Sequence, residues 1–343
     1  MPASFQARAL LHPHFMEPEF IITQAQPSGY MDVLAGGGLR VKLGPIDKVI
    51  YVNRMDIRTQ AAMNQASANQ LPSATINADF LSTATYNFRN RQEYNEFDVA
   101  EAGAYNVALP AAYRLASRQG IFQALRNAGL FGVTPANGEG LLNTPGATTA
   151  NLPPDSYGDA VLPTYDAGQL AIWFQGQITA ALSRMYLLGT PTRIVLLGPQ
   201  RVIGQMQLQN IIQTTSYQRP GAGTATTAQV ITKVSEEFDY EIEWAYDDTL
   251  IGMGAGSTGA NPVDAVLLVI PEINVATMPG INTNDFATLQ PNIAANTLQY
   301  ADMVAPVEVS TPIPEGVDVT STLRASSGWG LRAQGVTILN IPY

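Results

Sequence analysis

Residues 98–146 constrain the fold more than any other stretch, because a long helical pattern there runs into two glycine clusters. Asp98 and Glu101 have the spacing of a capping box, with Asp at the N-cap position. Pro110 lies inside the pattern and is expected to kink the helix, because proline lacks a backbone donor. The apolar stripe of this helix, with members three or four residues apart, comprises Ala102, Tyr105, Leu109, Tyr113 and Ala116. The clusters that follow are Gly129-Leu130-Phe131-Gly132 and Gly140-Leu141-Leu142-Asn143-Thr144-Pro145-Gly146.

A second helix is predicted at residues 166–185. Asp166 and Gln169 are spaced to cap its start, and Gly189 and Pro191 are expected to end it. Its apolar face consists of Leu170, Trp173, Phe174, Ile178, Leu182 and Met185. The residues between the two helices, 133–165, are rich in Pro, Gly, Thr and Asn and are therefore predicted to form a loop.

Several extended runs follow the second helix. Residues 193–197 form a buried type of strand, after which Pro199 opens a short helix. Residues 264–270 are apolar enough for a strand that is buried on both faces, and 274–296 are a polar connection. The chain closes with extended runs at 302–310 and 335–341. Clean alternation marks a strand at 239–246, with Tyr240, Ile242, Trp244 and Tyr246 on one face and Asp239, Glu241 and Glu243 on the other.

The N-terminal third is less regular. Residues 1–45 contain Pro13, Pro18 and Pro27 and are predicted to be an arm with little core of its own. Two extended runs, 48–52 and 83–88, are separated by the polar stretch Gln60 to Ser73. This order predicts a long hairpin that projects from the body of the molecule.

Composition excludes several function classes. Charged residues are 13% of the 343, about half the usual share, which suggests that much of the surface is hidden against other copies. The net charge is −10, and lysine occurs only at Lys42, Lys48 and Lys233, so sequence-specific nucleic-acid binding is not expected. Cysteine is absent, which removes disulfides and thiolate chemistry. The longest apolar run, 265–270, is too short to span a bilayer, so no membrane partner is expected.

No motif supports a catalytic, cofactor-binding or metal site. Residues 254–259 match G-x-G-x-x-G, but Asn261-Pro262 and a strand follow instead of a helix, so a strand-to-strand loop is predicted. The only histidines, His12 and His14, lie near Glu17 and Glu19 on the irregular arm, where no further ligand completes a metal site. No G-x-S-x-G motif is present.

Charged pairs offer interaction sites instead. The carboxylate pairs Glu236–Glu237 and Asp247–Asp248 do not share a face, so we expect solvated edges or partners for arginines of another subunit. The hairpin region carries two groups of arginines: Arg54 and Arg58 with Asp56, then Arg89 and Arg91 at its exit. Two interpretations stay open here, contact with a neighbouring copy or a charged hairpin that only keeps the protein soluble.

The order of these parts resembles the major capsid proteins of tailed bacteriophages that have the Hong Kong 97 fold. The strings that carry the resemblance are residues 94–102, the Gly-Leu-Leu-Asn-Thr-Pro-Gly run at 140–146, and 328–336 with Ile341-Pro342. The resemblance implies an α+β fold with four parts: an N-terminal arm (1–45), an extended E-loop (46–97), a P-domain with a long spine helix (98–165 and 298–343) and a mixed α/β A-domain (166–297).

The function implied is self-assembly into an icosahedral shell of pentamers and hexamers that encloses double-stranded DNA without reading its sequence. The shell would be the capsid of a virion, assembled in the cytoplasm of a host bacterium, with scaffolding, portal and decoration proteins as partners. The short, weakly charged arm implies a separate scaffolding protein or none. Few lysines are available for Lys–Asn cross-links, so none is expected at Lys42 or Lys48. The alternatives are an encapsulin-like compartment that holds a cargo enzyme, an enzyme of unknown class, and another phage structural protein.

Overall fold

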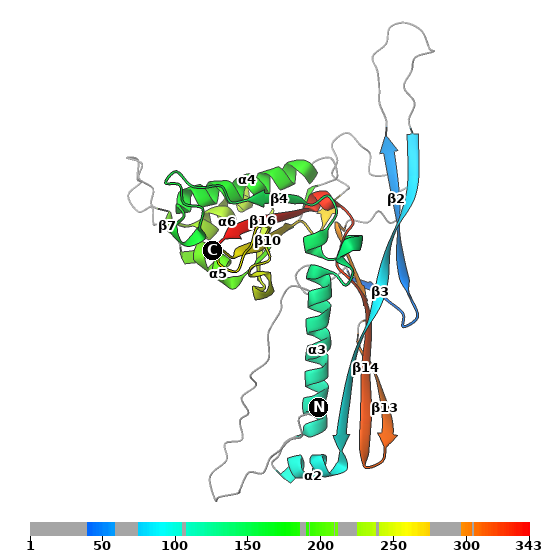
Figure 1. The fold of residues 1–343 in the computed structure, drawn as a ribbon. Coiled ribbons are helices and arrows are strands. Elements are labelled where there is room, and N and C mark those ends of the chain that lie inside the picture. The colour runs from blue at the N-terminus through cyan, green and yellow to red at the C-terminus, as the bar shows by residue number, and fades with distance from the viewer. Residues whose placement is uncertain are drawn as a thin grey trace, which may run out of the picture.

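The computed structural model of the chain describes residues 40–58, 75–104, 108–185, 190–191, 193–208, 210–211, 225–237, 240–274, 296–303 and 305–343. Within these residues the chain forms two parts that meet at the end of helix α3 (Leu109–Phe131) (Figure 1). One part is elongated, with α3 lying along several long strands. The other is a five-stranded sheet with helices on one face.

The elongated part is organised by one strand, β3 (Thr75–Asn95), whose 21 residues span roughly 70 Å. Its first half pairs antiparallel with β2 (Val49–Arg58), from Arg58↔Thr75 to Val49↔Ala84. Its second half pairs antiparallel with β14 (Gly316–Ser326), from Ser326↔Thr85 to Gly316↔Asn95. One continuous strand therefore belongs both to the β2–β3 hairpin, which extends away from the rest, and to the sheet beside α3 (Figure 1).

The remaining strands complete this sheet. Its order is β1-β12-β14-β3-β2, with β13 paired to β14 and β15 paired to β12. Their bounds are β1 (Arg40–Lys42), β12 (Leu298–Asp302), β13 (Val307–Ile313) and β15 (Trp329–Gly330). The predicted hairpin is confirmed in that the strands containing 48–52 and 83–88 are antiparallel partners, and both are longer than predicted. Within the second run only 83–84 pair with β2, because 85–88 pair with β14. The polar stretch at 60–73 lies outside the described residues.

The prediction of one helix kinked at Pro110 is wrong. The segment contains α2 (Glu96–Ala104), which begins two residues before Asp98, and a separate helix α3. Pro110 lies in the first turn of α3. A backbone N–H there would have no acceptor within the helix, so the proline breaks no helical hydrogen bond. Tyr105 lies outside the described residues. Ala116 was predicted to lie on the apolar face of the helix, but it is exposed. The buried face of α3 consists instead of Ser117, Ile121, Leu125 and Leu130.

The second part is a mixed sheet in the order β4-β16-β10-β6-β9. The outer pairs β4–β16 and β6–β9 are parallel, and the inner pairs are antiparallel. Its strands are β4 (Thr148–Asn151), β16 (Val336–Pro342), β10 (Val263–Val269), β6 (Arg193–Gly198) and β9 (Glu241–Tyr246).

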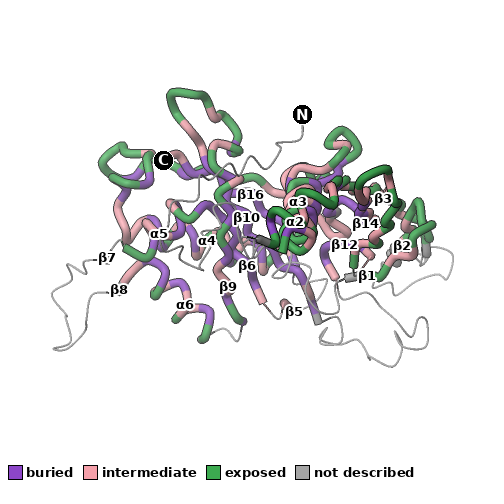
Figure 2. Tube along the Cα trace, turned by 90° about the horizontal axis from the view of Figure 1, so that it is seen from below, coloured by how far each residue is buried: buried purple, intermediate pink, exposed green. Residues whose placement is uncertain are grey.

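The central strand β10 is buried on both faces, as predicted. Ala265, Leu267 and Val269 enter one core, and Val266, Leu268 and Ile270, the residue after the strand, enter the other. Figure 2 shows that the buried backbone is concentrated at β10 and the strands beside it. The first core also contains residues of α3 and of the elongated sheet, including Leu125 and Leu323. A single core therefore ties the two parts of the molecule together.

Three helices cover the second core: α4 (Ala167–Met185), α5 (Gln200–Leu208) and α6 (Thr227–Glu237). Helix α4 confirms the prediction at 166–185. The Gln169 N–H donates to Asp166 Oδ1 at 2.8 Å, which caps the first turn. Four residues of the predicted face are fully buried: Leu170, Phe174, Ile178 and Met185. The other two, Trp173 and Leu182, are partly buried and pack against the same core.

Short elements fill the connections. Two small sheets pair β5 (Thr190–Pro191) with β11 (Ile273–Asn274) and β7 (Asn210–Ile211) with β8 (Ala225–Thr226). The 3-10 turns are η3 (Pro135–Asn137), η4 (Leu141–Asn143), η5 (Leu162–Thr164), η6 (Asp248–Leu250) and η8 (Ala333–Gly335).

Three further predictions need correction. The stretch 133–165 is not only loop, because β4 joins the edge of the sheet through β16. The run at 302–310 is two strands, since β12 ends at Asp302 and β13 begins at Val307. In β9, Ala245 is buried in the first core, because the strand separates two cores rather than a core from solvent, and Tyr246, its last residue, is exposed.

Candidate assembly surface

The glycine clusters after α3 form a tightly packed junction between the two parts. Gly132 and Gly140 both have positive φ, +75° and +88°, which side chains rarely adopt. A Cβ on Gly140 would lie 2.4 Å from the backbone N of Gly132, and one on Gly328 would lie 2.5 Å from the carbonyl oxygen of Gly129. The Gly140 N–H donates to the Gly328 carbonyl at 2.7 Å. The end of α3 is therefore fixed against the segment that leaves β14.

A buried carboxylate holds the same junction. Glu139 accepts hydrogen bonds from the hydroxyl of Tyr86 on β3 at 2.7 and 3.0 Å and from the Thr134 N–H at 2.9 Å. The Ser327 hydroxyl donates to it at 3.1 Å. Burial is the main cause that raises the pKa of Tyr86, so the phenol stays protonated as a donor. These contacts hold three chain segments together.

The β2–β3 hairpin carries an apolar face exposed to solvent. Tyr51 is 66% exposed and Phe80 is 67% exposed. Phe80 is paired with Asn53, two residues from Tyr51, so both rings project from the same face of the hairpin. Val49 is exposed on this face as well. Large exposed apolar side chains on a projecting element are typical of a protein contact site.

Arginines beside the long sheet pair mainly within the chain. Arg91 Nε lies 2.9 Å from Asp318 Oδ2 on β14, and Asp318 is the main cause that raises the arginine's pKa. Arg89 is exposed. On the other face of the sheet, Arg114 and Arg118 of α3 lie 3.1 and 3.6 Å from the carboxylate oxygens of Glu308 on β13.

Arg91 thus pairs within its own chain, which matches neither of the two interpretations that the sequence left open. The side chains of Arg54, Asp56 and Arg58 lie outside the described residues.

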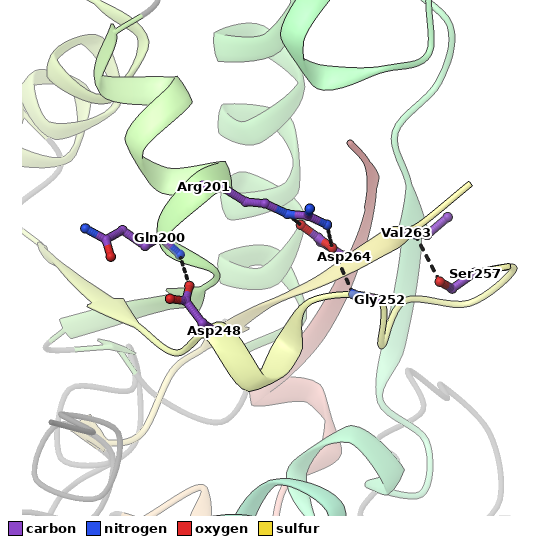
Figure 3. Close-up of polar contacts among 7 residues, drawn as sticks. All are labelled: Gln200, Arg201, Asp248, Gly252, Ser257, Val263 and Asp264. Atoms are coloured by element: carbon purple, nitrogen blue, oxygen red, sulfur yellow. Dashed lines mark hydrogen bonds and ion pairs between the residues drawn. The ribbon is translucent and has the colours of Figure 1, made fainter. Parts of the chain in front are cut away.

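The G-x-G-x-x-G stretch is a loop that leads into β10, as predicted, and no helix follows it. Asp264 at the start of β10 is fully buried and accepts two hydrogen bonds from Arg201, at 2.7 and 2.6 Å (Figure 3). It also accepts from the Gly252 N–H at 2.9 Å. Ser257 Oγ accepts from the Val263 N–H at 3.2 Å. Arg201 lies 4.4 Å from the centroid of the Tyr343 ring, so the loop is anchored to α5 and to the end of β16.

The paired carboxylates at 247–248 have separate structural roles. Asp248 Oδ1 accepts from the Gln200 N–H at 2.8 Å and caps α5 (Figure 3). Asp247 was predicted to be solvated or paired with another subunit, and this is wrong. It is buried, accepts from the N–H and hydroxyl of Thr249 at 3.0 and 2.6 Å, and lies 3.9 Å from Arg126 of α3. Glu236 is exposed, as expected for a solvated edge.

Other sites considered from the sequence gain no support from the geometry. Within the described ranges, no group of three or more His, Cys, Asp or Glu side chains is placed to hold a metal ion. His12, His14, Glu17 and Glu19 lie outside those ranges. Lys42 and Lys48 are exposed. Of the helices in the described part of the chain, none has the length and apolarity needed to cross a bilayer.

Comparison with known proteins identifies the fold. Neither a protein-family model nor a curated protein sequence matches the chain. Among solved structures, the capsid of Myoviridae phage XM1 is similar over 99% of this chain and 99% of its own, with a TM-score of 0.63 and 11% identity. The capsid of cyanophage P-SCSP1u is similar over 95% and 92%, with a TM-score of 0.56 and 11% identity. The capsid of an empty GTA particle is similar over 97% and 95%, with a TM-score of 0.52 and 11% identity. The described part of the chain therefore has the mixed α/β fold of phage capsid proteins.

Proposed function

We propose that this chain is the major capsid protein of a tailed bacteriophage, a structural protein that self-assembles into an icosahedral shell around double-stranded DNA. The observation that carries this proposal is the near-complete coverage in both directions between this chain and the capsid subunit of phage XM1. The solved structures named above are capsids, so no specific observation favours the encapsulin-like compartment.

The parts of the fold suggest how the subunit is divided. We assign residues 1–45 to an N-terminal arm, 46–97 to the E-loop, 98–165 with 298–343 to the P-domain, and 166–297 to the A-domain. The β2–β3 hairpin supports the E-loop assignment, because it extends from the body and exposes Tyr51 and Phe80. Helix α3 lies along the long sheet and is the natural spine helix of the P-domain.

The chemistry of the surface fits a shell rather than an enzyme. Identical subunits in rings of five and six make heterologous contacts, so many modest contacts add up over the particle. The net charge of −10 disfavours tight contact with phosphates, so packaged DNA would be enclosed without recognition of its sequence. Scaffolding, portal and decoration proteins are further partners in this proposal, with assembly in the host bacterial cytoplasm and residence in the virion.

Electron microscopy of the protein expressed alone tests the proposal. We expect closed particles, or rings of five and six subunits. If only monomers form, the measurement is repeated with a crowding agent and at raised protein concentration. A chain that stays monomeric under all of these conditions, and also when a scaffolding protein from its natural source is added, contradicts the shell function. Particles that copurify with a cargo enzyme and no DNA, when isolated from its natural source, would instead favour a compartment.

A further inference from the structure

The outer face of α4 carries no charged residue. Its exposed residues are Ile172, Gly176, Thr179 and Ser183, and Ile172 is 74% exposed. Arg184, the one charged residue of the helix, is partly buried and donates to Thr337 Oγ1 at 2.6 Å. A solvent-exposed helix ordinarily has charged and polar residues on its outer face. A helix face without charged residues is typical of one that is covered by another protein surface in the functional state.

An exposed aromatic ring extends this face. Tyr157 is 83% exposed. Its neighbour Ser156 is joined to α4 by two hydrogen bonds with the Gln169 side chain, at 3.1 and 2.7 Å. Ile172 lies one turn further along the same side of the helix as Gln169. We call Tyr157 together with the exposed residues of α4 the α4 outer face.

A second surface without charge is the loop at residues 249–263. These fifteen residues contain no Asp, Glu, Lys or Arg, and they expose Ile251 and Met253, the latter by 52%. Leu250, near the start of the loop, belongs to the core on the opposite side of the sheet from α4. Asp264, which holds the loop through Gly252, faces the α4 side of the sheet with Val266, so the loop lies at an end of the sheet rather than over the α4 outer face of its own subunit.

The loop is preorganised for contact. The hydrogen bonds of Asp264 to Arg201 and Gly252, and of Ser257 to Val263, fix it at both ends (Figure 3). A fixed loop loses little conformational entropy when it binds. Gly256 and Gly259 have open space around them, as does Gly176 on α4, so two backbones can approach closely.

The absence of charge indicates which kind of partner binds the α4 outer face. A nucleic acid would require cations, and the α4 outer face has none among its exposed residues. Copies of an acidic chain repel one another wherever their acidic surfaces meet. Two surfaces without charge escape this repulsion and avoid the desolvation of unpaired ions.

We infer that the 249–263 loop of one copy docks on the α4 outer face of the next copy, in a head-to-tail contact around a ring. This inference rests on the proposed shell function and names the surfaces that form the ring. Two different patches on separate parts of the subunit are what a closed heterologous ring requires.

Introduced cysteines test the contact, because the natural chain has none. The double variant Ile172→Cys/Met253→Cys is assembled and treated with a short bismaleimide. We expect a ladder of covalent oligomers up to the ring size. The two single variants, and the control Ile172→Cys/Leu115→Cys with its second cysteine on α3, should give no ladder. Far-UV circular dichroism and melting of unassembled subunits establish that each variant is folded.

A second measurement uses the single variants Ile172→Cys and Met253→Cys alone. Labelling of the introduced thiol by a maleimide dye should be at least tenfold slower in particles than in free subunits, at either position. If particles form and both sites label at the free rate without a ladder, the contact is wrong while the shell function stands. Dimers formed by Ile172→Cys alone would show a symmetric contact and overturn the head-to-tail arrangement. If the natural chain forms neither rings nor particles, the shell function and this inference both fail.

Discussion

At the scale of single residues, the buried Arg201–Asp264 pair is the interaction whose loss should cost most. Asp264 is fully buried and Arg201 is partly buried. Asp264→Asn keeps the shape and the acceptor for Gly252 but leaves the guanidinium without its carboxylate. We expect a loss of about 3 kcal/mol in the free energy of unfolding, measured by urea denaturation of the unassembled subunit.

A matched control is Arg91→Gln, which removes one partner of the exposed Arg91–Asp318 pair. Solvent and salt screen such a pair, so its removal should change stability little. Equal effects of the two substitutions would show that burial of Asp264 does not determine the strength of its pair with Arg201.

Asp155 provides a prediction about pH. Burial opposes its ionisation, but the N–H groups of Asp159, Tyr157 and Asp166 donate to its carboxylate and outweigh that effect. Its pKa therefore lies below the ordinary value of 3.8. Because the folded pKa is the lower one, the carboxylate stabilises the fold fully above about pH 4, and this contribution is lost as the pH falls further.

Asp155→Asn should thus be less stable than the natural chain at about pH 7, and the difference should shrink below about pH 4. Urea unfolding of both proteins across this range measures the difference directly. A gap that stays constant down to about pH 3 would mean that ionisation of Asp155 is not what stabilises the loop.

At the scale of elements, the junction between α3 and β14 depends on glycines in close contact. A Cβ at Gly328 would lie 2.5 Å from a backbone oxygen of Gly129, and backbone cannot yield as a flexible side chain does. Gly328→Ala should therefore lower the melting temperature, with a loss on the order of 1–3 kcal/mol.

The control is Gly204→Ala in α5, where nothing lies within 4 Å of the added Cβ. Alanine favours a helix interior over glycine, so this variant should gain about 0.5–1 kcal/mol. Calorimetry on both variants separates the loss of close approach from a general effect of a methyl group. A stable Gly328→Ala protein would refute the tight junction.

Elements with a strong local period were predictable from sequence, and those defined by distant partners were not. Helix α4 combines a cap at Asp166 with a regular apolar stripe, and β10 is apolar from Ala265 to its end at Val269. Strand β14 was missed although Val317, Val319 and Leu323 alternate, because the buried Ser321 interrupts the pattern. Pro110 was misplaced because a proline in a first turn and one in a helix interior look alike in sequence.

The roles of buried acids were equally hidden in the sequence. Asp264 meets Arg201 from 63 positions away, and Asp247 lies near Arg126 of α3. Only the folded topology brings such groups together, whereas spacing along the chain reports local neighbours. The exposed aromatic face of the hairpin had a weak local signal, since Tyr51 lies in a predicted strand with polar flanks.

At the scale of the whole molecule, the β2–β3 hairpin is the element that contributes least to the cores of a single subunit. Tyr51 and Phe80 are exposed on one face of an element that extends away from both cores (Figure 1). Because neither ring is buried in the subunit, the double variant Tyr51→Asp/Phe80→Asp should melt at nearly the natural temperature. If the hairpin lies over a neighbouring copy in the shell, two new carboxylates there would be desolvated without partners.

We therefore expect subunits of this variant to fold and to form no closed particles, as seen by electron microscopy and analytical ultracentrifugation. Tyr51→Phe, which keeps the aromatic ring and removes only the hydroxyl, should assemble normally. Normal particles from the double variant would mean that the hairpin face stays exposed in the shell, and the E-loop assignment at 46–97 would have to be abandoned. Failure of the double variant to fold would show instead that the hairpin face stabilises the subunit itself, which its exposure in the structure argues against.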